Sequence, residues 1–322
     1  MIRTPCKILL ILATLLFTSV SWASDLPTVR LGALEYGTVN WELDTIRNNK
    51  LDEKHGFTLE VVPMGGGSAS DIAFLGGEID VMVSDVIWAA AQRAEGRDVK
   101  FIPYSTAVGG IMVKVDSGIS ALKDLADKRI GIAGGPLDKS WLILQAYAKQ
   151  EGNIDLKADA KQEYGAPPIM FKAAMSGDID AVINFWHFQA KAKAAGLNEI
   201  ISVQDAAESL GLDPSIPLLG YIVKGDMAAE LAQGLFAASR DAKAILGSDD
   251  GAFDAIRKRM NAKNDAQFEA LKAGFRAGIP GSATVDEKAV DKTLQLMAEL
   301  GGPDLVGKAT TLPKDLFISL DQ

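Results

Sequence analysis

The chain has 322 residues, 48% of them hydrophobic and 23% charged, which are the proportions of a globular protein long enough for two domains. Its 42 acidic and 33 basic residues give a net charge of -9, and no basic run offers a surface for nucleic acid or an anionic membrane. One Cys and two His residues are too few for a disulfide framework or a Cys- or His-based metal site. We therefore expect no nucleic-acid partner, no metal and no cofactor.

Residues 1–23 have the composition of a secretory signal peptide. A basic start precedes an apolar run from Ile8 to about Val20, and Ser21-Trp22-Ala23 places small residues where a signal peptidase reads. An N-terminal anchor helix is the alternative, although the run is short for a membrane span. Cleavage would remove Cys6, the one cysteine, and no second run of membrane length occurs later in the sequence. We expect a soluble, periplasmic, monomeric protein without direct membrane insertion after signal removal.

From residue 28 onward, segments typical of strands and helices alternate. The expected strands lie at 28–34, 57–63, 80–83, 129–133 and 181–183, and the expected helices at 41–54, 68–75, 140–151 and 168–175. Several sequence features recur about one hundred residues apart: Gly77-Glu-Ile-Asp80 returns as Gly177-Asp-Ile-Asp180, and Trp41 as Trp141. Alternation predicts an α/β fold, and the repeat predicts two similar lobes, each a doubly wound, mostly parallel sheet.

The sequence that follows the second of the two repeats predicts how the lobes are joined. Residues 218–224 resemble a strand, and the remainder of the chain is mostly helical, at 227–246, 252–260, 266–277 and 286–300. The first lobe ends through 99–105 and the second returns near Leu218, so two crossing strands form a hinge, with a ligand cleft between the lobes. We expect lobe 1 to comprise 24–105 and 220–322, and lobe 2 to comprise 106–219.

Four loops lie where open α/β sheets bind ligands, beyond the carboxyl ends of strands and beside helix N-termini. They span residues 35–41, 65–68, 134–141 and 184–187. The glycines of the second loop could bring backbone amides close to a ligand or serve a simple turn equally well. The third loop resembles a phosphate-binding loop only superficially, because Asp138 stands where that motif has Gly before Lys-Ser.

All four tryptophans beyond the signal lie in or just after these strand ends. Aromatic side chains at a cleft can stack on a planar or apolar ligand. Trp88 and Trp141 are favoured as helix core residues. Trp41 and Trp186 lie in loops rich in polar residues and are favoured as ligand contacts.

The charged residues near these loops are mostly acidic: Glu35, Glu42, Asp85 and Asp138, with Lys139 the main cation. A site for a strongly anionic sulfonate or phosphate normally presents Arg, although backbone amides could replace it. The balance favours a ligand that bears an amine or another polar nitrogen. Glu42 and Asp138 could instead be charges favoured at a helix start.

Catalysis receives little support from the sequence. There is no G-x-S-x-G, no H-E-x-x-H and no cysteine nucleophile beyond the signal. His187 is the histidine with site potential, and a lone histidine is more often a hydrogen-bond partner than a base. We expect a protein that is not an enzyme; an exported enzyme would need an acid/base pair around Asp85 and His187.

The stretch LKDLADKRIG at 122–131, GGGS at 65–68, LGGEID at 75–80 and MSGDIDA at 175–181 together resemble one family. The chain is similar to the periplasmic substrate-binding component of an ABC importer, in the nitrate/sulfonate/taurine group that includes binding proteins for thiamine pyrimidine precursors. The resemblance implies a type II binding-protein fold and closure on one small solute for a membrane permease. The resemblance and the loops together give these candidate ligand-binding residues: Glu35, Tyr36, Trp41, Gly67, Ser68, Asp85, Asp138, Ser140, Asn184, Trp186 and His187.

Two departures from the family put the ligand in question. The fourth loop reads Asn184-Phe-Trp-His187 where many relatives show a Trp-x-Pro-like stretch, and the loops lack arginine. We expect a periplasmic solute-binding component of an ABC importer that captures a small polar organic solute, an amine, a sulfonate or a pyrimidine-like compound. The alternative is a non-transport accessory or sensory protein that partners a secreted enzyme.

Overall fold

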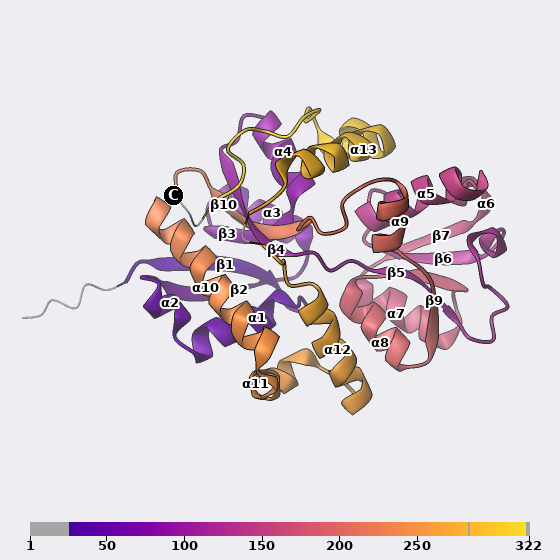
Figure 1. Cartoon of the computed structure of the whole chain (residues 1–322), viewed down its shortest axis with the longest axis horizontal. Helices are drawn as coiled ribbons and strands as arrows, with labels where there is room; N and C mark the ends of the chain where they lie inside the picture. Colours follow the sequence, from indigo (N-terminus) through magenta and orange to yellow (C-terminus); the bar gives the residue numbers. More distant parts are fainter. Residues whose placement is uncertain (1–25, 283, 320–322) are drawn as a thin grey trace, which may run out of the picture.

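The computed structural model describes residues 26–282 and 284–319, and the expected signal at 1–23 lies outside them. Within the described residues, two five-stranded sheets carry helices on their faces and lie side by side (Figure 1). We call the half built on the first sheet lobe 1 and the half built on the second sheet lobe 2. The α/β, two-lobed architecture expected from the sequence is confirmed.

The sheet of lobe 1 has the strand order β2-β1-β3-β10-β4. Its strands are β1 (Thr28–Leu34), β2 (Thr58–Met64), β3 (Val81–Asp85), β4 (Val99–Ser105) and β10 (Leu219–Lys224). β1 pairs parallel to β2 and β3, whereas β10 lies antiparallel between β3 and β4, so four of the five strands run in one direction. The helices between them are α1 (Val39–Asn48), α2 (Leu51–Lys54), α3 (Gly67–Gly76) and α4 (Val86–Ala94). The helix expected at 41–54 is interrupted because Lys50 is left-handed, with φ 52°.

Lobe 2 repeats this plan with the strand order β7-β6-β8-β5-β9. Its strands are β5 (Gly110–Lys114), β6 (Arg129–Ala133), β7 (Lys161–Gly165), β8 (Ala181–Ile183) and β9 (Leu197–Ser202). Its helices are the 3₁₀ turn η1 (Leu122–Leu125), α5 (Lys139–Gly152), α6 (Leu156–Asp159), α7 (Pro167–Ser176), α8 (Trp186–Ala194) and α9 (Val203–Ser209). The antiparallel strand here is β5, between β8 and β9. In each sheet, the reversed strand is therefore the first one formed after the chain enters from the other lobe.

The repeated G-x-I-D motif builds the same junction in both lobes. Gly77 and Gly177 end α3 and α7 in the left-handed conformation, with φ 82° and 85°, which glycine adopts without strain. The following aspartate accepts a hydrogen bond from the backbone N–H of an arginine in the neighbouring parallel strand; the pairs are Asp80 with Arg30 (3.0 Å) and Asp180 with Arg129 (2.8 Å). The motif therefore serves the fold at the amino ends of β3 and β8, away from the candidate loops.

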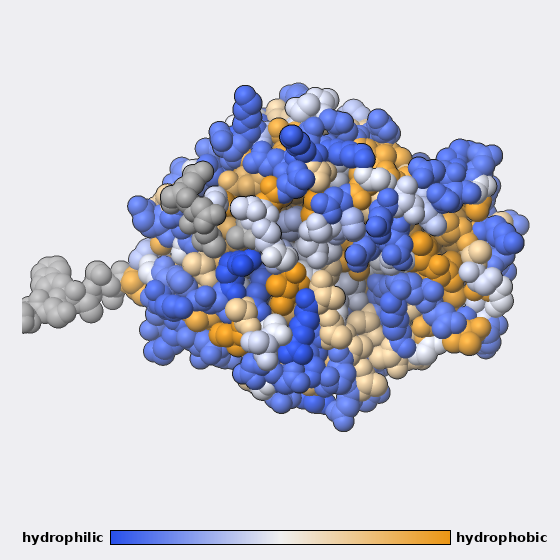
Figure 2. All heavy atoms as spheres, in the orientation of Figure 1, coloured by the Kyte–Doolittle hydropathy of each residue, from blue (hydrophilic) through white to orange (hydrophobic). Residues whose placement is uncertain are grey.

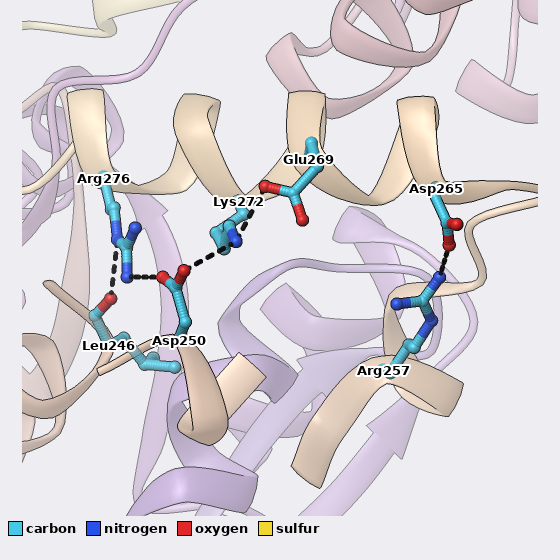
Figure 3. A network of polar contacts seen from close by, with 7 residues as sticks. All are labelled: Leu246, Asp250, Arg257, Asp265, Glu269, Lys272 and Arg276. Atoms are coloured by element: carbon cyan, nitrogen blue, oxygen red, sulfur yellow. Dashed lines mark hydrogen bonds and ion pairs between the residues drawn. The ribbon is translucent and has the colours of Figure 1, made fainter. Parts of the chain in front are cut away.

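The C-terminal helices connect the lobes. They are α10 (Ala229–Ser248), α11 (Asp250–Met260), α12 (Asp265–Ala277) and α13 (Glu287–Val306). α10 packs on α1 and α2, α12 packs on α8 of lobe 2, and α13 contacts both α4 and α5. Figure 3 shows the ion pairs between α11 and α12, in which Asp250 binds Arg276 at 2.6 Å and Lys272 at 3.2 Å, and Arg257 binds Asp265. These pairs lie at the surface between the two helices, whose apolar side chains pack together beneath them.

The surface on the face in Figure 2 is mostly hydrophilic, with hydrophobic residues in patches between charged ones. No helix within residues 26–282 and 284–319 combines the length and the apolar character needed to span a membrane. The apolar side chains of the strands lie between each sheet and its helices, as in other layered α/β proteins.

Candidate functional site

The loops that follow β1 and β3 in lobe 1 and β6 and β8 in lobe 2 meet between the lobes. Two contacts demonstrate this. One joins Asp85, the last residue of β3, to Lys139, the first residue of α5. The other joins Trp41 of α1 to Trp186 of α8. We call them the polar contact and the apolar contact.

The polar contact is an ion pair with a 2.8 Å distance between Lys139 Nζ and Asp85 Oδ2. Asp85 caps α4, because its Oδ1 accepts a hydrogen bond from the backbone N–H of Trp88 at 2.9 Å. Asp138 caps α5 in the same way through Trp141 N, at 3.0 Å. Both caps belong to an Asp-x-x-Trp sequence. The helix caps thus hold both sides of the pair in place.

The charges of three carboxylates, Asp85, Asp138 and Asp71, act on the ammonium of Lys139. Burial, and then the charge of Asp85, raises the pKa of Asp71 on α3. Burial also raises the pKa of Asp138, to about 6, against the hydrogen bond from Trp141. Burial lowers the pKa of Lys139, but the charge and hydrogen bond of Asp85 outweigh it, so the net shift is upward. The site therefore favours a positive group at the position of the Lys139 ammonium.

The apolar contact is an aromatic cluster at the junction of α1, α8 and α12. The rings of Trp41 and Trp186 meet edge to face at 5.7 Å, and Phe275 of α12 lies 5.9 Å from Trp41. Trp186 also packs against Gly274, where a Cβ would overlap the indole. Trp41 is only 4% exposed. Contrary to the expectation from the sequence, Trp41 is a core residue between the lobes and does not lie in an open loop.

Two candidates from the fourth loop are buried. Asn184 donates to Pro167 O at 2.9 Å and accepts from Phe185 N at 2.8 Å, so its amide links the end of β8 to the start of α7. His187 is 5% exposed and its ring lies 4.5 Å from that of Phe188. Burial lowers the pKa of His187 to about 3, and its Nε2 has no hydrogen-bond partner among the described residues. These contacts indicate that both side chains have structural roles.

The remaining candidates are accessible. Glu35 is exposed, and Tyr36 beside it is half-buried, which raises the pKa of its hydroxyl. Gly67 and Ser68 are exposed in the first turn of α3, and a Cβ on Gly67 would meet no other atom within contact distance. Ser140 is half-buried in the first turn of α5. Of the candidates, the structure joins Trp41 to Trp186 directly and groups Asp85 with Asp138 around Lys139.

Two kinds of residue lie near the site but outside the candidates predicted from the sequence. Lys139 and Asp71 complete the charged group, and the Asp-x-x-Trp shared by the two helix starts was a signal for it. Lobe 2 also exposes large apolar side chains next to the carboxyl ends of β6, β7 and β8: Leu137, Ile169 and Phe185. Leu137 and Ile169 each follow a proline, Pro136 and Pro168, within a few residues of a strand end, which could have marked them.

Two kinds of reactive centre were considered from the sequence, a metal site and an acid/base pair of Asp85 with His187. Over the described range, no group of His, Cys, Asp and Glu side chains is placed to hold a metal ion. Asp85 is hydrogen-bonded to Trp88 N and paired with Lys139, whereas His187 is buried among aromatic rings. The acid/base pair that an exported enzyme would require is therefore not formed between these two residues.

Comparison with solved structures identifies similar folds. The chain is similar to the alkanesulfonate-binding protein SsuA from Xanthomonas axonopodis pv. citri, at 19% identity and a TM-score of 0.68, over 92% of this chain and 98% of that one. It is similar to the periplasmic aliphatic sulphonate binding protein SsuA from Escherichia coli, at 17% identity and a TM-score of 0.70, over 90% and 98%. The periplasmic nitrate-binding protein NrtA from Synechocystis PCC 6803 matches at 12% identity and a TM-score of 0.58, over 76% and 69%.

These likenesses show that the fold is that of two-lobed binding proteins. No curated protein matches the chain. A model of the family described as NMT1/THI5 like matches residues 53–244, which is more than half of the chain, and the chain therefore belongs to that family.

Proposed function

We propose that the protein is the periplasmic solute-binding component of an ABC importer. The observation that carries this proposal is the meeting of loop residues from both lobes at the carboxyl ends of the central strands, with Asp85 and Lys139 in direct contact. Ligands of open α/β sheets bind at this position, and clefts between lobes are common solute sites. The family and the fold likeness to sulfonate- and nitrate-binding proteins support the same role.

The solute is a small polar organic compound, and an amine or another polar nitrogen suits the site better than a sulfonate. Asp71, Asp85 and Asp138 supply three carboxylates, against one Lys and no Arg in the candidate loops. A pyrimidine-like compound fits the same logic, since its exocyclic amine can donate hydrogen bonds to carboxylates while Leu137 or Phe185 contacts its ring.

The proposed working cycle uses two lobes, at 24–105 with 220–322 and at 106–219, which close on the solute about the two chain crossings. An export signal at 1–23 would deliver the chain to the periplasm, where the closed form docks on a membrane permease. The accessible candidates Glu35, Tyr36, Gly67, Ser68, Asp85, Asp138 and Ser140 would contact the solute. Trp41, Asn184 and His187 are buried and would support the loops from behind, whereas the half-buried Trp186 would still contact the solute as the sequence predicts.

A ligand screen by thermal unfolding tests this proposal. The purified chain is heated with primary amines, amino-sulfonates, pyrimidines, nitrate and short carboxylates in turn, and a bound solute raises the melting temperature as its concentration rises. Asp85→Asn should weaken the binding of an active amine or pyrimidine at least several-fold. Lys193→Met, which removes an ion pair with Glu199 inside lobe 2, should leave it unchanged. A broad panel without any shift would contradict the transport role.

A non-transport accessory protein is the second candidate, because the lobes touch directly through both the polar and the apolar contact. A bilobed protein held closed in this way could present one fixed surface to a secreted enzyme. It would bind none of the panel, and its interlobe distance would be constant across solutes and salt.

A further inference from the structure

The polar contact connects elements that are rigid on both sides. Asp85 ends a central strand of lobe 1 and caps α4, and its second carboxylate oxygen faces Lys139. Lys139 begins α5 of lobe 2 directly after Asp138, which caps that helix. Because both partners sit at helix starts, little chain can move without moving the lobes themselves. The ion pair can therefore form only when the lobes are close together, and its attraction favours that position.

The charges around this pair are distributed unequally between the lobes. Lobe 1 contributes Asp71 and Asp85, and lobe 2 contributes Asp138 and Lys139. Every charge identified as shifting the pKa of Lys139 is negative: Asp85, Asp138 and Asp71. Without the ammonium, two carboxylates of one lobe would face one carboxylate of the other. Repulsion between like charges is strongest where burial removes water, and burial raises the pKa of both Asp71 and Asp138.

We infer that Lys139 is an electrostatic latch between the lobes, whose ammonium holds Asp71 and Asp85 of lobe 1 against Asp138 of lobe 2. This inference rests on the proposed function, in which the lobes move relative to each other. A solute that binds between the lobes must then displace the Lys139 ammonium and supply a positive or hydrogen-bond-donating group in its place. The latch thereby makes closure depend on the charge of the solute.

The latch model predicts an unequal response to removing either partner. Lys139→Met leaves three carboxylates without the cation and turns attraction between the lobes into repulsion. Asp85→Asn keeps the α4 cap, since an amide oxygen also accepts the hydrogen bond of Trp88, and leaves Lys139 between Asp71 and Asp138. The lobes should therefore separate more in Lys139→Met than in Asp85→Asn.

Distances between spin labels test the latch without any solute. Labels are placed at Glu78→Cys in lobe 1 and Asp178→Cys in lobe 2, two exposed positions, in the full chain with Cys6→Ser. The protein is unfolded and refolded beforehand to remove co-purified solutes. We expect the label distance to increase by several ångströms in Lys139→Met and by less in Asp85→Asn. Lys139→Arg and the control Lys193→Met should match the parent protein.

Salt provides an independent check of the same distance. Raising NaCl from about 0.05 to 1 M screens charges over a few ångströms. It should lengthen the distance in the parent and change it less in Asp85→Asn, where the ion pair is already missing and only Asp71 and Asp138 act on Lys139. If the distance between the spin labels is the same in Lys139→Met as in the parent, the latch is wrong. This holds even if the ligand screen has identified a solute. A distance that responds to Lys139→Met while no solute binds would instead sustain the latch and count against transport.

Discussion

The two contacts between the lobes differ in what holds them together. The apolar contact buries Trp41 against Trp186 and Phe275, and its strength follows the apolar area removed from water, which salt affects little. The polar contact joins two side chains that remain 18% and 32% exposed, so it contributes little free energy and weakens with salt. The lobes also meet where α13 packs on α5. In the latch model, these apolar contacts hold the lobes together, and the polar contact adjusts how far they open.

A second ion pair lies entirely within lobe 1 and sharpens this comparison. Glu42, next to Trp41 on α1, is fully buried and pairs with Lys243 of α10 at 2.5 Å. Tyr221 donates a hydrogen bond to the same carboxylate at 2.6 Å, and Lys243 lies over the ring of Tyr104. Burial lowers the pKa of Lys243 against the opposing charge of Glu42. This buried pair holds α1 on its lobe, and so supports Trp41 from behind.

Trp41→Ala should be the most damaging change to the apolar contact. It removes a buried indole from a packed cluster, and large-to-small changes of this kind cost about 3–5 kcal/mol of unfolding free energy. Urea unfolding followed by circular dichroism measures the loss. Trp88→Ala, in the same lobe but only half-buried, is the control and should cost less. A loss below about 1 kcal/mol for Trp41→Ala would mean that the cluster does not hold the lobes together.

Lys243→Met tests the buried pair. It leaves the buried side chain of Glu42 without its cation while the hydrogen bond from Tyr221 remains, and breaking a buried pair from one side costs about 3–5 kcal/mol. The loss should not change between low and high salt, because ions cannot reach the site. Replacing both partners, as Glu42→Gln with Lys243→Met, should recover part of the stability. A salt-dependent loss would place the pair nearer solvent than the structure does.

The sequence predicted the fold well because its signals were local. The strands at Thr28–Leu34, Arg129–Ala133 and Ala181–Ile183 begin and end where apolar periodicity placed them, and glycines such as Gly77 and Gly177 end the helices that precede the repeated Ile-Asp. The strands β5, β7 and β9 were not predicted, although Gly109 and Ser117-Gly118 flank β5 as turn signals.

The candidate site was harder to predict because packing between distant segments decides it. Trp41 stands among polar residues in the sequence, yet the C-terminal helix α12, more than two hundred residues away, covers it through Phe275. Asp85 and Asp138 were found from their places at strand ends. Their common partner Lys139 could not be assigned, because nothing local shows which lobe it faces.

His187→Phe should remove a loss of stability on acidification. The folded protein keeps His187 neutral down to a pKa of about 3, whereas the unfolded chain binds a proton below about 6.5, so stability falls as pH drops through that window. In the parent this amounts to about 2 kcal/mol between pH 6.5 and 4.5. Chemical denaturation at both pH values gives the difference, and His55→Phe is the control. Parallel pH profiles for parent and variant would show that His187 is not held neutral.

The pH dependence of stability that Asp138 causes should have the opposite sign and be smaller, and Asp138→Asn should remove it. The folded protein keeps a proton on Asp138 up to a pKa of about 6, whereas the unfolded chain loses it near 3.8, so this group adds stability below about pH 4 and loses it as pH rises through 6. The Asn variant keeps the α5 cap, and its stability relative to the parent should rise by roughly 1 kcal/mol between pH 5 and pH 7. Melting temperatures of the variant and the parent, measured from pH 5 to 8, test this difference. A variant that loses stability relative to the parent at neutral pH would show that the Asp138 charge is compensated in the fold.

Lys139→Met should have the smallest effect on stability. The pair it breaks is partly exposed, and such pairs contribute less than about 1 kcal/mol, so the unfolding free energy should fall by at most that amount at low salt and not at all in 1 M NaCl. Denaturant curves for this variant and for Lys243→Met, run side by side at both salt concentrations, provide the measurement. A loss as large and as salt-independent as that of Lys243→Met would show that the polar contact is a structural pair like the one inside lobe 1. A small, salt-sensitive loss would agree with the latch, in which Lys139 controls the position of the lobes and contributes little to the stability of the chain.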